Sequence, residues 1–143
     1  FIGKGADVGG DGTSNQIVIG WGAEGNGSNT VTLGDSNTTE GVFAYGAYQE
    51  ISDQSVKENV VTIAGAVDKV KAMRGVTYNK IGRDTAKVGV IAQEMELVLP
   101  EVVAEGSGGL KSVAYGNIVA VLIEAMKEQQ SQIDDLQQQI NNL

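Results

Sequence analysis

The feature that most limits how this chain can fold is a seam of apolar residues at its C-terminal end. Between Val119 and Leu143, apolar residues recur in alternating steps of three and four, which is the heptad spacing of a coiled coil. A helix with so narrow an apolar stripe buries it against copies of itself. The predicted seam has Val119, Met126, Ile133 and Ile140 at its a positions and Leu122, Gln129, Leu136 and Leu143 at its d positions.

This seam predicts a parallel homo-oligomer. Gln129 places a polar side chain at a d position, where it can fix the register or the number of chains. The mixture of Ile, Leu, Val and Met suits either a dimer or a trimer. The alternative is a single amphipathic helix that lies on its own domain, and the polar character of the chain from Gln129 onward argues against it.

The first 50 residues have a different character and contain most of the 20 glycines. Residues 14–20 align with residues 28–34, and weaker copies are predicted at 42–46 and 1–6. Each unit is a short alternating strand followed by a turn of Gly, Asn, Ser or Thr, which predicts the stacked rungs of a β-solenoid or fibre. A Gly-rich linker is the alternative, and the strict spacing of the apolar positions argues against it.

The segment between the repeats and the seam predicts a small mixed domain of helices and strands. Apolar residues at helical spacing run from Val56 to Met73, with a weak point at Gly65. A second helix is expected from Gln93 to Leu99, where Pro100 ends it. Short strands are expected at 76–78, 87–92 and 110–115.

The predicted fold class is therefore α+β, in three parts. Residues 1–51 form the end of a β fibre or solenoid, residues 52–116 a globular domain, and residues 117–143 the coiled-coil helix. The chain begins at Phe1 rather than at Met, so we expect it to be a fragment of a longer protein.

The composition excludes several kinds of chemistry. The chain has no Cys and no His, which removes disulfides, thiol nucleophiles, Cys-type zinc sites and the commonest general base. No metal or cofactor is expected. The net charge of −8 argues against nucleic acid as the main partner, and no apolar run reaches the roughly 18 residues that a membrane span needs. Proton transfer is left to a carboxylate, a Tyr or a Lys with a shifted pKa.

One pair of residues has a spacing that suits nucleophilic chemistry. Ser52 and Lys57 lie at the junction between the repeats and the globular part, where a Ser before a helix can turn back toward a Lys in its first turn. A Lys that loses its charge through burial can accept a proton from Ser, and Ser-Lys pairs are known catalytic arrangements. Taken alone, the spacing favours a structural role, because such residues are ordinary N-caps and residues 55–58 have the form of a capping box.

Several motifs resemble those of one known family. Residues 52–60, SDQSVKENV, resemble the signature SDxxxKENI of the self-cleaving intramolecular chaperone domain found at the C-terminus of phage tail spikes, tail fibres and neck appendages, in endosialidases and in myelin regulatory factor. Further matches follow in the same order at 88–94, 99–103 and 113–128. The chain departs from the pattern at Ala114, where many members carry Asp, and at Val60, where Ile is commoner.

The resemblance implies a serine endopeptidase that acts once, on its own chain. The cleaved bond would be Ile51–Ser52, with Ser52 as the nucleophile and Lys57 as its general base. Ser52 would attack the preceding carbonyl directly or through an N-to-O acyl shift, and water would complete the hydrolysis. Residues of the same motif that would support the pair are Asp53, Glu58 and Asn59.

The resemblance also implies partners and a location. The domain would form a homotrimer, guide trimerisation and folding of the fibre segment before it, and then release itself in the host cytoplasm while the mature fibre joins the virion tail. A host-surface receptor would be a partner of the parent fibre. Two alternatives stay open: a trimerisation tip that does not cleave, and a receptor-binding fibre end in which Trp21, Tyr45 and Tyr48 line a glycan surface.

Overall fold

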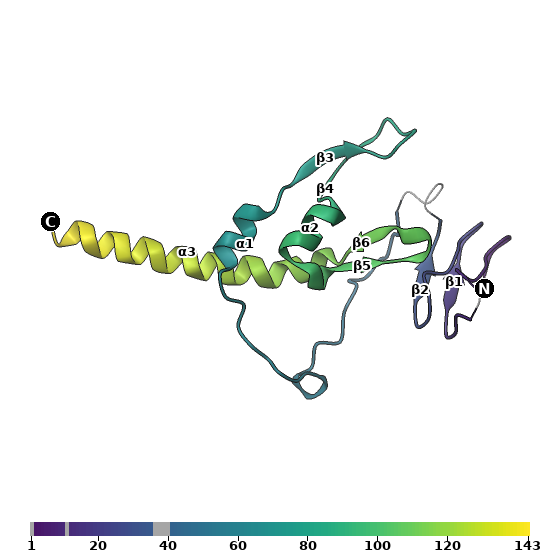
Figure 1. The fold of residues 1–143 in the computed structure, drawn as a ribbon, viewed down its shortest axis with the longest axis horizontal. Helices are drawn as coiled ribbons and strands as arrows, with labels where there is room; N and C mark the ends of the chain where they lie inside the picture. The colour runs from purple at the N-terminus through teal and green to yellow at the C-terminus, as the bar shows by residue number, and fades with distance from the viewer. Residues whose placement is uncertain (1, 11, 36–40) are drawn as a thin grey trace. The chain divides into compact units, whose positions relative to one another are not determined.

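The computed structural model describes residues 2–10, 12–35 and 41–143 (Figure 1). Among these residues there are three α-helices, including a long C-terminal one, and three two-stranded sheets. This confirms the predicted combination of helices and strands. The chain divides into two compact units, of which the first contains the described residues up to Glu58 together with Glu105–Leu110, and the second contains Asn59–Ala104 and Lys111–Leu143.

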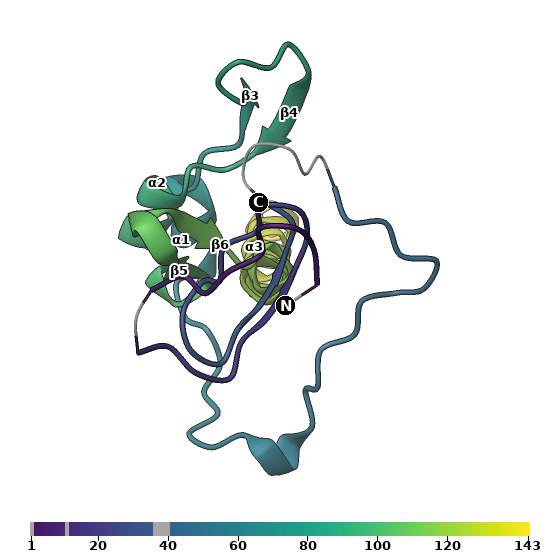
Figure 2. The same ribbon diagram turned by 90° about the vertical axis from the view of Figure 1, so that its right-hand side faces the viewer.

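The first unit is built on two short parallel strands, β1 (Ile17–Ile19) and β2 (Val31–Leu33). Their pairing joins Ile17 to Val31, so the register equals the spacing at which the two sequence stretches align. Ile2 forms a further parallel bridge to Ile19 on the other side of β1. The N-terminal chain therefore winds in superposed loops (purple in Figure 2).

The interior of these loops is narrow. Val18 and Ala23 are completely buried, while the neighbouring aliphatic residues of β1 and β2 face outward. Gly20 has a φ of 141°, and a Cβ at this position would lie 2.9 Å from the Cα of Gly34. Only glycine permits both this backbone conformation and this close approach of two successive loops.

Polar side chains repeat at the same spacing in the turns before the two strands. The Asn15 side chain donates a hydrogen bond to the Asn29 side chain over 2.9 Å, 14 residues along the chain. Both residues have a positive φ, a conformation that Asn tolerates better than most residues. The neighbouring backbone N–H of Ser14 donates to the hydroxyl of Ser28. Two positions of the first turn are therefore hydrogen-bonded to the equivalent positions, 14 residues along the chain, of the second.

The prediction of a strand in the third copy of the repeat was wrong. Residues 42–46 contain no strand and are exposed. Their aliphatic and aromatic residues do not alternate between an inner and an outer face in the way that β1 and β2 do. The connection from β2 to this segment, residues 36–40, lies outside the described residues.

The second unit is held together by three helices, α1 (Ala66–Ala72), α2 (Ala92–Val98) and α3 (Ile118–Asn141). Each contributes small or flexible apolar side chains to one core. Met95 of α2 and Val121 of α3 are both 1% exposed. Their burial is what fixes the short helices, because seven-residue helices are not stable on their own. The other buried members of the core are Ala66, Val67, Leu99, Val102 and Ala125.

Two hairpins complete this part of the chain. Strands β3 (Val76–Asn79) and β4 (Ala86–Gly89) are antiparallel, with a turn in which Gly82 has a positive φ. Strands β5 (Val103–Glu105) and β6 (Lys111–Val113) form the other two-stranded sheet. Single 3₁₀ turns link the elements, and their bounds are η1 (Gln54–Val56), η2 (Pro100–Val102), η3 (Ser107–Gly109) and η4 (Tyr115–Asn117).

The helix predicted from Val56 to Met73 was wrong over its first half. Within this range only α1 is an α-helix, and the chain from Lys57 to Gly65 contains no helix or strand and is largely exposed. Two local features explain the break. Residues 60–63 are all β-branched, which lowers helix propensity, and Gly65 takes a left-handed conformation directly before α1.

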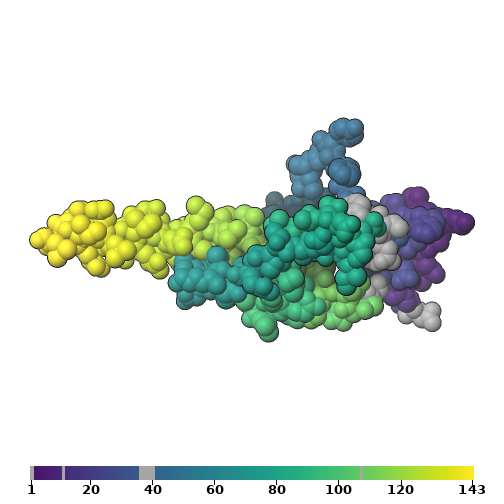
Figure 3. Space-filling view, turned by 90° about the horizontal axis from the view of Figure 1, so that it is seen from above, coloured from purple at the N-terminus to yellow at the C-terminus, as the bar shows by residue number. Residues whose placement is uncertain are grey.

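Helix α3 has two different faces. Val121 and Ala125 are buried in the core of its own unit, whereas the apolar residues of the predicted seam are exposed along its full length. The last turns of α3 project beyond the core (yellow in Figure 3). Within the described parts of the chain, no helix is long and apolar enough to cross a membrane.

Candidate active site

The candidate pair lies on one small turn of the first unit. Ser52 precedes the 3₁₀ turn η1, and Lys57 follows it directly. The Lys57 backbone N–H donates to the Gln54 carbonyl, and the Val56 N–H donates to the Asp53 carbonyl. These two bonds fold the chain back on itself, so that residues five positions apart come side by side.

The two predicted catalytic side chains are in contact. The Nζ atom of Lys57 donates a hydrogen bond to the Oγ atom of Ser52 over 2.5 Å. This distance is short enough for a proton to pass between a hydroxyl and an amine. The contact joins a potential nucleophile to a potential base, which is the arrangement that serine nucleophiles require.

Asp53 is the N-cap of this turn. Its Oδ1 atom accepts a hydrogen bond from the Ser55 backbone N–H over 2.7 Å. Hydrogen bonds from the Ser55 hydroxyl and from this N–H lower the pKa of the Asp53 carboxyl, because both favour its charged form. The predicted capping box at 55–58 was wrong, since Ser55 lies inside the turn and its N–H is the group that is capped.

The other two predicted supporting residues lie after the turn. Glu58 is exposed, and Asn59 lies at a bend with a φ of 54°. No hydrogen bond described for this segment links either side chain to the Ser52 hydroxyl. Their part in the chemistry stays a prediction.

The whole neighbourhood of the pair is exposed on the single chain. Residues 41–62 contain no buried position. Several large apolar side chains in this stretch have no cover, and Ile51, on the acyl side of the predicted cleavage site, is 89% exposed. A surface of this kind usually marks a contact with another protein chain. Its other uncovered apolar members are Val42, Phe43, Tyr45, Tyr48, Val56, Val60 and Val61.

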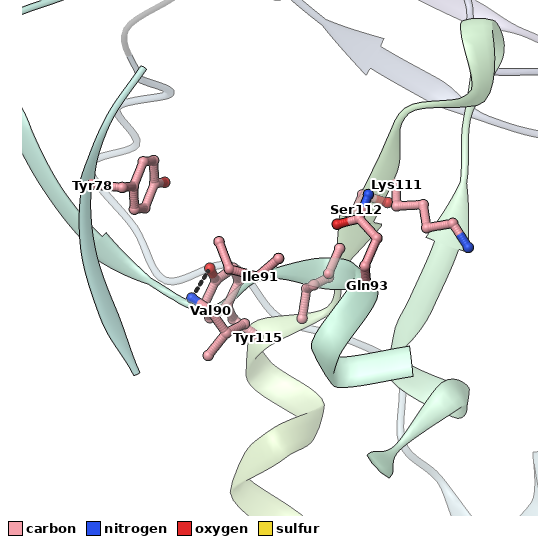
Figure 4. Close-up of a pocket in the computed structure, with 9 residues that line it drawn as sticks. Tyr78, Val90, Ile91, Gln93, Lys111, Ser112 and Tyr115 are labelled. Atoms are coloured by element: carbon pink, nitrogen blue, oxygen red, sulfur yellow. Dashed lines mark hydrogen bonds between the residues drawn. The ribbon is translucent and has the colours of Figure 1, made fainter. Parts of the chain in front are cut away.

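A second candidate is an open hollow in the second unit (Figure 4). Three of its polar residues already make hydrogen bonds within the unit. Lys111 binds the Glu96 carboxylate at 2.5 and 2.6 Å, the Ser112 hydroxyl donates to the Ala104 carbonyl, and the Tyr115 hydroxyl accepts from the Val90 N–H. The hollow therefore has packing and structural hydrogen bonds, and no group in it resembles a nucleophile with a base.

One residue with a clear structural role was missed by the sequence analysis. Glu128 of α3 accepts hydrogen bonds from the first N–H groups of α1, those of Ala66 and Val67, at 2.9 and 3.0 Å. The bonds from Val67 and Ala66 lower the pKa of the Glu128 carboxyl. The partners are more than 60 residues apart in sequence, and no spacing pattern links them.

Among the residues that the structure describes, no group of three or more acidic side chains is arranged to hold a metal ion. The eight residues of the predicted seam, including Gln129, are exposed; seven of them lie on α3, and Leu143 follows the end of the helix. The structure thus brings the predicted catalytic pair together and leaves the predicted interface uncovered.

Comparison with known proteins shows what the segment that carries this pair is similar to. Residues 52–104 match the model of a peptidase family described as the chaperone of endosialidase. The matched stretch begins at Ser52, the first residue of the pair. The resemblance predicted from the motifs is therefore confirmed.

The relatives found among known proteins are phage tail fibre proteins. The chain is 35% identical over 98 residues, or 62% of its length, to the long tail fiber protein Gp37 of Enterobacteria phages K3 and T2. It is 29% identical over 156 aligned positions, or 94% of its length, to the Gp37 protein of Salmonella phage S16. The chain spans only 8%, 7% and 21% of the lengths of these three proteins.

Proposed function

We propose that this chain is the C-terminal intramolecular chaperone of a phage tail fibre, and that it releases itself by cutting the Ile51–Ser52 bond. The observation that carries the proposal is the 2.5 Å contact between the Lys57 amine and the Ser52 hydroxyl. The match of residues 52–104 to the family and the tail fibre relatives support the chaperone role.

In the proposed reaction, the neutral Lys57 amine takes the proton of the Ser52 hydroxyl as Oγ attacks the Ile51 carbonyl carbon. The new C–O bond replaces the C–N bond of the peptide, and the proton passes to the released Ser52 amine. The resulting ester joins Ile51 to the Ser52 side chain. Water then hydrolyses the ester and leaves a carboxylate on Ile51. Each chain reacts once.

The exposed surroundings of the pair support a role for other copies of the chain. A lysine acts as a base only after it has lost its proton, and removal from water favours the neutral form. On one chain the turn is open to solvent. We therefore infer that neighbouring chains of a homotrimer cover the apolar residues around the turn and exclude water from it.

The proposed trimer forms through the seam of α3. Three chains joined at their C-terminal helices hold their fibre segments at a high local concentration and in register. Parallel rungs that pair over long distances are slow to nucleate, so such a start is an advantage. The mature fibre then belongs to the virion tail, and the released domain stays in the host cytoplasm. No nucleic acid, membrane or cofactor takes part.

The test is the intact mass of the purified chain under denaturing conditions. We expect two fragments, 1–51 and 52–143, from the parent chain, and a single species from Ser52→Ala and from Lys57→Ala. A Lys57→Arg variant, which keeps the charge and cannot act as a base near neutral pH, is the matched control for the lysine. If the assembled parent stays whole after long incubation, the chain is a trimerisation tip or a receptor-binding end without peptidase activity.

A further inference from the structure

We infer that Asp53 is a positioning residue for the self-cleavage: it holds the turn that brings the Lys57 amine to the Ser52 hydroxyl. The inference rests on the proposed function, since it concerns the same pair. It assigns to Asp53 no contact with the reacting atoms. Its carboxylate acts through the backbone of the turn.

The pair needs a turn because of its spacing. An extended chain advances about 3.3–3.6 Å per residue, so five steps would separate the two Cα atoms by roughly 17 Å. A lysine side chain cannot cover that distance. The observed contact of 2.5 Å between Nζ and Oγ therefore exists only while residues 53–57 are folded back.

The turn has little else to stabilise it. It is a single 3₁₀ turn of three residues, a length at which isolated helical structure is not stable in water. None of its residues is buried, so packing does not fix it within the chain. Two backbone bonds close it, at 3.3 Å from Val56 to Asp53 and at 3.1 Å from Lys57 to Gln54.

The bond from the Ser55 N–H to the Asp53 side chain is shorter than the two backbone bonds that close this turn. At 2.7 Å, the carboxylate captures the Ser55 N–H, which would otherwise have no partner at the start of a helical turn. A capping side chain of this kind fixes where the turn begins. Because Lys57 follows the turn directly, the start of the turn also sets the direction in which the lysine leaves the backbone.

The experiment compares first-order rates of self-cleavage by intact mass in the full chain. Asp53→Ala removes the cap. We expect it to slow cleavage roughly 2- to 30-fold, because loss of an N-cap reduces the population of the folded turn by about that factor. Asp53→Asn keeps an acceptor oxygen and is expected to restore the rate to within about twofold. Gln54→Ala, which changes an exposed side chain of the same turn, is the matched control and keeps the parent rate.

A second measurement separates this inference from the proposed function. In the Ser52→Ala background, which cannot cleave, hydrogen exchange at the Ser55 amide reports the cap directly. We expect Asp53→Ala to speed this exchange and Asp53→Asn to leave it slow. Exchange that is unchanged by Asp53→Ala overturns the inference whether or not the parent chain cleaves itself.

The cleavage rates of the Asp53 variants can also contradict the inference. A parent rate in Asp53→Ala contradicts the positioning role and leaves the Ser52–Lys57 proposal intact. An Asp53→Asn variant as slow as Asp53→Ala also contradicts it, because the negative charge rather than the cap would then matter. A parent chain that never cleaves refutes the proposed function itself.

Discussion

The buried methionine of α2 gives a direct test of the core that carries α3. Met95 is 1% exposed and lies among the apolar side chains of α1 and α3. Met95→Ala removes the three side-chain heavy atoms beyond Cβ and leaves a cavity that the short helices can fill only in part. Substitutions of this kind cost about 2–5 kcal/mol. For a unit of 60–100 residues, this lowers the melting temperature by about 8 °C or more.

The matched control lies on the same helix. Leu97 is 87% exposed, so Leu97→Ala removes a similar apolar volume from the surface and is expected to change stability by no more than about 0.5 kcal/mol. The assay is thermal unfolding followed by circular dichroism, in the Ser52→Ala background and at one fixed chain concentration, because melting of an oligomer depends on concentration. Equal losses in the two variants would refute this account of the core. A loss at Leu97 that grows on dilution would instead place Leu97 in a contact between chains.

Two further predictions concern α3. Hydrogen bonds hold the pKa of Glu128 below its ordinary value, so the stability that the carboxylate contributes is present above about pH 4.5 and is lost as pH falls through the lowered pKa. The melting temperature of Glu128→Gln should therefore lie below that of the parent at pH 7 and approach it at pH 3. A difference that stays constant with pH would contradict a stabilising role for the bonds from Ala66 and Val67 to Glu128. If the proposed trimer forms through the seam, light scattering should show an oligomer that Ile133→Asp abolishes, whereas Ser131→Asp, on the outer side of the helix, should leave it intact.

Local signals predicted some elements closely. The helix expected from Gln93 to Leu99 is α2, Ala92–Val98, and Pro100 follows its end as predicted. The contact between Ser52 and Lys57 was also within reach of the sequence, because all of its determinants lie within six consecutive residues. Elements whose boundaries are set by neighbouring residues can be derived from those residues alone.

Other features were missed, either because the local pattern allows two structures or because the partners lie far apart in the chain. The spacing of Val56, Val60 and Ile63 suits a helix, and the β-branched run around them allows an extended chain equally well. The hydrogen bond from the start of α1 to Glu128 joins residues that no local sequence pattern relates. Strand β5 was missed because its three residues carry no alternation and are defined only by pairing with β6.

The local character of the turn has a consequence for the proposed mechanism. Every bond in the turn joins residues no more than five positions apart, so none of these bonds involves the seam or the fibre rungs. Under the proposal, the contact between the two side chains is made within one chain, and assembly acts on cleavage by excluding water from around Lys57. Under the proposal, Ile133→Asp should keep the slow exchange of the Ser55 amide and still lose cleavage. Cleavage at the parent rate by a monomeric Ile133→Asp chain would show that no second copy is needed to activate the lysine.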